Sequence, residues 1–291
     1  MITKLSFILV IISGIIHPLW NLILKKSDEK VAFYLNMHLV YTALFGFILL
    51  FYPLKEITLL GWAFVVLSAF MHFLYQIYLC RTYYLGDMSL TYPIIRSAPI
   101  FVLFGGIIFL REMPSLWAVA GIITVIFGVN VINQKTLSFA AMLAPFRHMN
   151  KAATIAALLT AFFSACYSVV DKKGVLAMDP ILFFYLFFTL SGFFFLVYFA
   201  FLKEKRGRYM QVLKKDIFKI TLAAVLEFSS YILILYAFRV SKIAYIVALR
   251  QISVVFGALY GILFLKEKHA DVRFVGSVII FIGIFLITVF G

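Results

Sequence analysis

The chain has 291 residues and a formal net charge of +14, and 65% of its residues are hydrophobic while only 13% are charged. With a mean hydropathy of +1.08, this composition excludes a soluble globular domain and is typical of a polytopic membrane protein. The surplus positive charge is explained by loops beside anionic lipid headgroups and does not require a nucleic acid partner. Both cysteines, Cys80 and Cys166, lie in apolar runs, so we expect neither a disulfide framework nor a metal-ligand cluster.

The first apolar run covers 5–24 and ends in Lys25-Lys26, without a small-residue cleavage site. We interpret it as an uncleaved first membrane span. The sequence contains no Asn-x-Ser/Thr acceptor site, which favours a bacterial or archaeal cytoplasmic membrane.

Ten apolar runs are long enough to cross a bilayer core about 30 Å thick as helices. They cover 5–24, 31–53, 58–80, 88–110, 114–133, 152–170, 180–202, 217–238, 243–265 and 272–290. The connections are too short for a soluble domain, so function must lie among the helices. The longer connection at 134–151 could form an amphipathic surface helix through 137–146.

The second half of the chain repeats the first. The segment from Gly106 to Glu112 is matched by the segment from Gly261 to Glu267, and glycines follow at 121 and 128 and again at 276 and 283. We therefore predict one repeat over 1–134, a linker over 135–151 and a second repeat over 152–291. Five spans in each repeat give the two repeats opposite orientations in the membrane, which is typical of transporters.

The first and sixth spans carry matching polar stripes. Along one helical face, Ser13, His17, Trp20 and Asn21 correspond to Thr160, Ser164, Tyr167 and Ser168. Polar groups on one face of an apolar span point away from lipid, so Trp20, Asn21, Tyr167 and Ser168 are candidate substrate-binding residues. Trp20 lies near a helix end, however, and an interfacial anchor is the alternative.

Three ionisable residues lie deep in the predicted spans: Arg96 in the fourth, Glu227 in the eighth and Arg250 in the ninth. A charge near the middle of a span costs about 2.5–3.5 kcal/mol on insertion scales, so each needs a partner, water or a ligand. The arginines occupy nearly equivalent places in the two repeats. Together they favour binding of a carboxylate or another anion, whereas the alternative is that each extends to the near interface or bonds to a helix carbonyl.

Glu227 has two possible roles. It could exchange a proton and couple transport to a proton gradient, or it could be the fixed partner of an arginine. His72 and Gln76 share a helical face and form a second polar candidate, although a lone histidine in an apolar helix is commonly a hydrogen-bonded packing residue.

Other features have mainly structural interpretations. Pro93 and Pro99 flank Arg96, which predicts a broken or hinged fourth helix. The glycine pairs of the fifth and tenth spans, and Gly257 with Gly261, predict close helix packing. Glu112 and Glu267 lie at helix ends, where salt bridges are expected.

Several motifs resemble those of EamA-type members of the drug/metabolite transporter superfamily. They are Trp20-Asn21 before a lysine-rich turn, the run from Tyr92 to Pro99, Phe109 to Glu112, Ala248 to Ser253, and Phe264 to Glu267. The resemblance covers essentially the whole chain. It implies an all-α membrane fold of ten helices in two inverted five-helix repeats, a central substrate site that includes Tyr92, peripheral fifth and tenth helices, and alternating access.

The favoured function is thus secondary transport of a small metabolite, such as an amino acid or another carboxylate-bearing solute, or of a drug. The alternative is a membrane-embedded enzyme acting on a lipid-linked substrate, but the sequence lacks the familiar catalytic and metal-binding motifs. We expect no catalytic residue, no cofactor and no metal, a small-molecule substrate, and a monomer or homodimer. Loop charge places the termini outside the cytoplasm, whereas the resemblance implies that they lie inside.

Overall fold

The computed structural model describes residues 2–86, 88–134, 151–201, 208–265 and 270–291, and these residues form helices without any strand. The helices are α1 (Lys4–Lys25), α2 (Lys30–Phe45), η1 (Gly46–Leu50), η2 (Leu54–Glu56), α3 (Leu59–Leu85), α4 (Met88–Ile95), α5 (Ala98–Leu110), α6 (Leu116–Ile132), α8 (Lys151–Ala177), α9 (Pro180–Phe201), α10 (Arg208–Val240), α11 (Ile243–Leu249), α12 (Ile252–Leu265) and α13 (Ala270–Phe290).

These helices account for the ten predicted spans. Within the described residues, nine spans are long and apolar enough to cross a membrane, and the shorter apolar helix α6 occupies the place of the fifth. The possible surface helix at 137–146 and Glu267 lie outside the described residues. Large apolar side chains such as Leu60, Phe104, Phe218 and Phe281 are more than half exposed, as a lipid-facing surface requires. The protein is an all-α, multi-pass integral membrane protein.

Local sequence explains where several helices begin. Thr3, Thr58 and Ser115 precede α1, α3 and α6, and their side-chain oxygens accept hydrogen bonds from the backbone N–H groups of Ser6, Gly61 and Ala118. Each bond satisfies a donor that has no partner inside the helix.

The sixth span is longer than predicted. The sequence places its end at residue 170, whereas α8 continues to Ala177 and buries Asp171 and Lys172. The prediction was wrong because both charged groups find polar partners inside the protein, so they do not end the apolar environment. Helix α10 begins at Arg208, but non-helical backbone at Asp216 separates its first part from the segment that begins at residue 217, where the sequence placed the eighth span.

The fourth and ninth spans are both broken. In the fourth, α4 ends at Ile95 and α5 begins at Ala98, which confirms the break predicted from Pro93 and Pro99. In the ninth, α11 ends at Leu249 and α12 begins at Ile252. Arg96 and Arg250 therefore occupy the first position of each break. The two arginines match in structure although the spacing from arginine to the following Glu112 or Glu267 differs by one residue.

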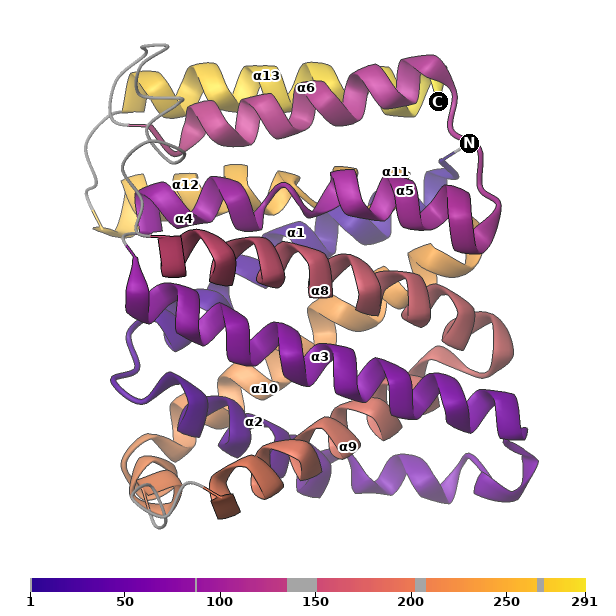
Figure 1. Ribbon diagram of the computed structural model, residues 1–291, viewed down its shortest axis with the longest axis vertical. Helices are drawn as coiled ribbons and strands as arrows, with labels where there is room; N and C mark the ends of the chain where they lie inside the picture. The colour runs from indigo at the N-terminus through magenta and orange to yellow at the C-terminus, as the bar shows by residue number, and fades with distance from the viewer. Residues whose placement is uncertain (1, 87, 135–150, 202–207, 266–269) are drawn as a thin grey trace.

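Helix packing follows a pseudo-two-fold symmetry between the halves (Figure 1). Helix α3 of the first half packs on α8 of the second, and the equivalent helix α10 packs on α1. Likewise, α5 packs on α8 as α12 packs on α1, and α3 on α9 as α10 on α2. Every one of these contacts joins one half to the other, so the interior of the bundle is built by both repeats.

The pair formed by α6 and α13 lies at one edge of the molecule (Figure 1) and establishes the inversion. A Cβ atom on Gly121 would lie 2.7 Å from the Gly283 carbonyl oxygen, and one on Gly128 would lie 3.0 Å from that of Gly276. The two helices therefore run antiparallel with their backbones in close contact, as the glycines predicted. Because equivalent helices are antiparallel, the symmetry axis is perpendicular to them, and the repeats have inverted topology.

Candidate functional site

The two arginines at the helix breaks converge on the same interior region. Arg96 and Arg250 are each partly buried. Both guanidinium groups are close enough to the His17 imidazole on α1 and to the Tyr75 hydroxyl on α3 to interact with them electrostatically. The breaks thus bring two cations, one from each half, to a common neighbourhood between α1 and α3.

Different tyrosines support the two arginines. The Arg96 Nη2 group donates a hydrogen bond to the Tyr92 hydroxyl oxygen at 2.6 Å, and its Cζ atom lies 4.8 Å from the centre of the same ring. The Arg250 Cζ atom lies 5.0 Å from the centre of the Tyr231 ring on α10. The arginines are related by the repeat, but the groups that position them are not.

Glu227 is the acidic residue associated with this pair. It lies on α10, partly buried, and interacts electrostatically with Arg250. One of its carboxylate oxygens, Oε2, is buried without a hydrogen-bond partner, and so is Nε of Arg250. Unpartnered buried polar atoms are costly, so these two atoms are suited to receive a polar ligand.

Trp20 and Asn21 both contact His17. The Trp20 Nε1 group donates a hydrogen bond to Nδ1 of His17 at 3.2 Å, and the Asn21 side-chain amide lies 2.9 Å from Nε2. Trp20 is only 3% exposed, which places its ring inside the protein and not at the lipid interface. His17 also interacts electrostatically with both arginines. Trp20 and Asn21 therefore contact a neighbour of the arginines.

Tyr167, Ser168, His72 and Gln76 are buried in contacts between helices or within one. The His72 ring stacks on Tyr167 with centres 4.0 Å apart, and Gln76 accepts a hydrogen bond from His38 of α2 at 2.9 Å. The Ser168 hydroxyl donates to the backbone oxygen of Ser164 on its own helix. These four residues therefore pack the interior around the arginines.

A carboxylate that was not predicted as a site residue lies among them. Asp171 is fully buried. Its Oδ1 atom accepts a hydrogen bond from the Ser68 hydroxyl at 2.5 Å, and its Oδ2 atom lies 2.5 Å from the Tyr231 hydroxyl and 3.0 Å from Nε2 of His72. We call these four residues the Asp171 cluster. The signal in the sequence was Ser68, which precedes His72 by one helical turn on the same face of α3.

Hydrogen bonds between the halves gather at the end of the bundle where both termini lie (Figure 1). Glu112 of the first half accepts a hydrogen bond from the backbone N–H of Ile243 at 2.6 Å, and its other oxygen lies 3.5 Å from Nζ of Lys172. Lys172 also donates to the backbone oxygens of Phe238 and Ser241. Glu112 thus forms a salt bridge, as predicted, but its partner is Lys172 of the second repeat and not the cation beside it in sequence.

Two further contacts strengthen this end. The Ser6 hydroxyl on α1 lies 2.8 Å from the Ser241 hydroxyl, and Nζ of Lys242 donates to the backbone oxygen of Met113 at 2.6 Å. The short turn from Ser241 to Ile243, which leads into the broken ninth span, is therefore bound on several sides by the first half. We call this set of contacts the terminal-end contacts.

Three comparisons with known proteins bear on this arrangement. A search of curated proteins found no match. Among solved structures, 29 chains match. One, titled only "Crystal structure of protein", covers 99% of this chain and 96% of its own with a TM-score of 0.72 at 12% identity. At that identity the likeness shows the fold alone.

A family model gives the remaining match. Residues 151–289 match the EamA-like transporter family, whose members are membrane transporters of the drug/metabolite transporter superfamily. The matched segment contains Glu227, Arg250 and the broken ninth span. The predicted repeat boundaries at 134 and 152 stay a prediction. The match covers slightly less than half of the chain, and over residues 151–289 the chain is similar to the EamA-like transporter family.

Proposed function

We propose that this protein is a secondary transporter that moves a small solute bearing a carboxylate or another anionic group, such as an amino acid, by alternating access. The observation that carries this proposal is the convergence of Arg96 and Arg250 at matched breaks of equivalent spans. Discontinuous helices near the middle of the membrane are where inverted-repeat transporters bind their substrates. We propose a bacterial or archaeal cytoplasmic membrane as its setting.

The chemistry of the arginines favours an anion. A planar guanidinium group binds a carboxylate through two parallel hydrogen bonds, and each remains charged at any physiological pH. The buried, unpartnered Nε of Arg250 supplies a donor, and the unpartnered Oε2 of Glu227, whose carboxylate interacts electrostatically with Arg250, supplies an acceptor. A solute with both a carboxylate and an ammonium group would satisfy both atoms, which makes an amino acid the substrate class that fits best. In the empty site, Glu227 would balance Arg250 or carry a proton.

The terminal-end contacts support alternating access. They join the two halves through Glu112, Lys172 and the turn at Ser241 to Ile243, and so close one end of the bundle. A transporter that opens alternately to each side must break the contacts at one end during its cycle. Hydrogen bonds and one ion pair can be exchanged for water at modest net cost, unlike a packed apolar interface.

The test is transport by purified protein in liposomes. We would supply a panel of radiolabelled amino acids, monocarboxylates and phosphorylated sugars, and compare the wild type with Arg96→Gln, Arg250→Gln and the corresponding lysine variants. Loss of a charge-assisted hydrogen bond costs about 1.5–3 kcal/mol, so each glutamine variant should reduce uptake of the anionic solute about 10- to 150-fold. The lysine variants should retain part of the activity, because charge remains without the fork geometry.

The exposed Arg239 on α10 offers a matched control. Arg239→Gln removes the same charge outside the proposed site and should leave uptake unchanged. If Arg96→Gln and Arg250→Gln both transport as the wild type does, the arginines do not bind substrate. If turnover of a solute occurs without flux across the membrane, an enzyme replaces the transporter as the function.

A further inference from the structure

We propose that the Asp171 cluster is an intramembrane proton-binding site that couples transport to a proton gradient. This inference rests on the proposed transport function and adds to it the ion that drives the cycle. Asp171 lies on α8, whereas Glu227, the proton carrier suggested by the sequence, lies on α10. Asp171 contacts α3 and α10 directly.

The cluster has the chemistry to hold a proton reversibly. Ser68, Tyr231 and His72 direct their polar atoms at the two oxygens of Asp171, at 2.5, 2.5 and 3.0 Å. Without an added proton, neutral His72 donates its Nε2–H group to the carboxylate and the pair carries a charge of −1. An added proton forms an O–H or N–H bond on this pair and brings its charge to zero. The same proton leaves to water when the site opens to the other side.

The architecture does not need this charge. By the repeat, Asp171 corresponds to Leu24, Tyr231 to Phe73, Ser68 to Leu226 and His72 to Ser230. The four equivalent positions in the other half therefore carry no charged or histidine side chain, and Leu24 is 1% exposed there. Apolar residues of similar volume generally replace buried ionic groups without loss of stability. An acid and a histidine that are buried together at one set of positions, and absent from the equivalent set, indicate a function beyond packing.

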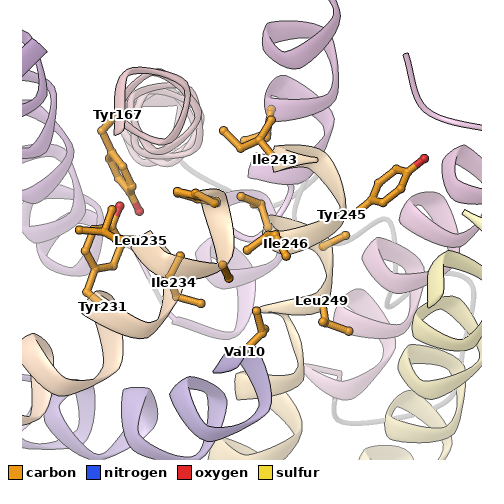
Figure 2. Packing of buried hydrophobic residues seen from close by; sticks show 14 of the residues in the cluster. Val10, Tyr167, Tyr231, Ile234, Leu235, Ile243, Tyr245, Ile246 and Leu249 are labelled. Carbon is orange, nitrogen blue, oxygen red and sulfur yellow. The ribbon is translucent and has the colours of Figure 1, made fainter. Parts of the chain in front are cut away.

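Tyr231 connects the cluster to the substrate arginine. Its hydroxyl group donates to Asp171, while its ring lies 5.0 Å from Cζ of Arg250. Figure 2 shows Tyr231 beside Tyr167, the residue whose ring stacks on His72, and the centres of the two tyrosine rings are 6.3 Å apart. A ligand that draws the Arg250 guanidinium off the Tyr231 ring changes how Tyr231 holds Asp171. By reciprocity, protonation of the cluster changes the affinity at Arg250.

The charged and titratable groups around Asp171 come from three helices. His72 reaches it from α3, Tyr231 from α10, and Tyr167 lies one turn earlier on α8. Arg250 is the next charge, on the far side of Tyr231. The adjacent Lys172 is bonded elsewhere, to the backbone oxygens of Phe238 and Ser241 and to Glu112, so it does not neutralise Asp171.

The first experiment tests proton binding without any substrate. Infrared difference spectra of the purified protein between acidic and alkaline pH should contain carboxyl and imidazole bands from the cluster. Asp171→Asn is nearly isosteric and keeps an oxygen for the Ser68 hydroxyl, so the fold should be retained. Its spectrum should lose the carboxyl band, whereas Glu227→Gln should keep it. A wild-type spectrum without bands that depend on Asp171 would overturn the proposal even if transport itself is demonstrated.

The second experiment uses liposomes and a mixture of radiolabelled amino acids. Asp171→Asn should reduce accumulation driven by a pH gradient at least tenfold and keep exchange at equal pH within about threefold of the wild type. Tyr231→Phe keeps the ring beside Arg250 but removes the hydroxyl. It should also reduce accumulation driven by a pH gradient more than it reduces exchange at equal pH. If Asp171→Asn accumulates solute normally and Glu227→Gln does not, the coupling proton binds Glu227 and the proposal fails. If wild-type protein moves none of the solutes, the proposed substrate class fails instead, while the infrared result stands.

Discussion

Two pairs of equivalent spans lie across the symmetry axis of this protein, and they differ in kind. The pair α6 and α13 is continuous, and its glycines bring the two backbones together. The fourth and ninth spans also meet, through α5 and α11, but each is interrupted at an arginine. The pair α6 and α13 thus forms a rigid support, whereas the fourth and ninth spans are polar and discontinuous. We infer that the first pair stays together during transport while the second rearranges.

Locking the terminal-end contacts is the strongest test of this contrast. Ser6→Cys together with Ser241→Cys places two thiols where hydroxyl oxygens are 2.8 Å apart, in a background with Cys80→Ala and Cys166→Ala. Oxidation should join α1 to the turn before α11 and abolish transport, and reduction should restore it. Transport is measured in liposomes, and peptide mapping verifies the disulfide.

Each single cysteine variant, oxidised in the same way, serves as the control and should transport normally. If the cross-linked protein transports at the wild-type rate, this end of the bundle does not open. The rearrangement would then have to occur elsewhere, and the contrast between the two pairs of spans would be lost.

The glycines of the rigid pair provide the second test. A Cβ atom on Gly283 would lie 2.7 Å from the Gly121 backbone oxygen and 2.8 Å from the Val125 backbone nitrogen, whereas one on Gly257 would meet only the Pro18 side chain at 3.7 Å. Gly283→Ala should therefore destabilise the protein by about 1–3 kcal/mol through overpacking. Gly257→Ala should leave stability unchanged or raise it, since alanine favours a helix over glycine by about 1 kcal/mol.

Thermal unfolding in detergent, followed by the loss of monodisperse protein, measures both variants. The expected result is a lower Tm for Gly283→Ala only. Equal Tm values would mean that α6 and α13 separate at little cost, and the pair could no longer be described as a rigid support.

The sequence predicted one break and missed the other for a physical reason. Pro93 and Pro99 remove backbone donors next to Arg96, so local chemistry predicts the interruption of the fourth span. The run from Ala248 to Ser253 contains no proline. There the backbone tightens, with Gln251 N–H bonded to the Ala248 oxygen and Ser253 N–H to the Arg250 oxygen. Packing against the first half holds this break, and local residue preferences do not reveal it.

Asp171 was missed because its partners are distant in sequence. An Asp-Lys-Lys run at the end of an apolar stretch normally marks the edge of the membrane. Ser68, which donates to Asp171, is 103 positions away, and Phe238, which accepts from Lys172, is 66 positions away. Helix number, repeat symmetry and the arginines follow from composition and periodicity, whereas the pairing of buried charges depends on which helices meet. The sequence position of Trp20 likewise suits either an interfacial anchor or the protein interior. Only the packing of the helices shows that the side chain lies in the interior.

The smallest effect on uptake is expected from removing the tyrosine hydroxyl groups beside the two arginines of the broken spans. Tyr92→Phe keeps the ring near Arg96 but removes the hydroxyl oxygen that accepts its hydrogen bond at 2.6 Å. The donor is charged, and such a bond contributes about 1.5–3 kcal/mol, but Tyr92 acts on the solute only through the position of Arg96. The concentration for half-maximal uptake should therefore rise only about twofold to tenfold, with little change in maximal rate. Tyr231→Phe should change this concentration less, because Tyr231 supports Arg250 through its ring face, which phenylalanine retains in part. Initial uptake rates over a range of solute concentrations measure both. Equal increases for the two variants would show that the arginines are supported alike in function, despite their different neighbours.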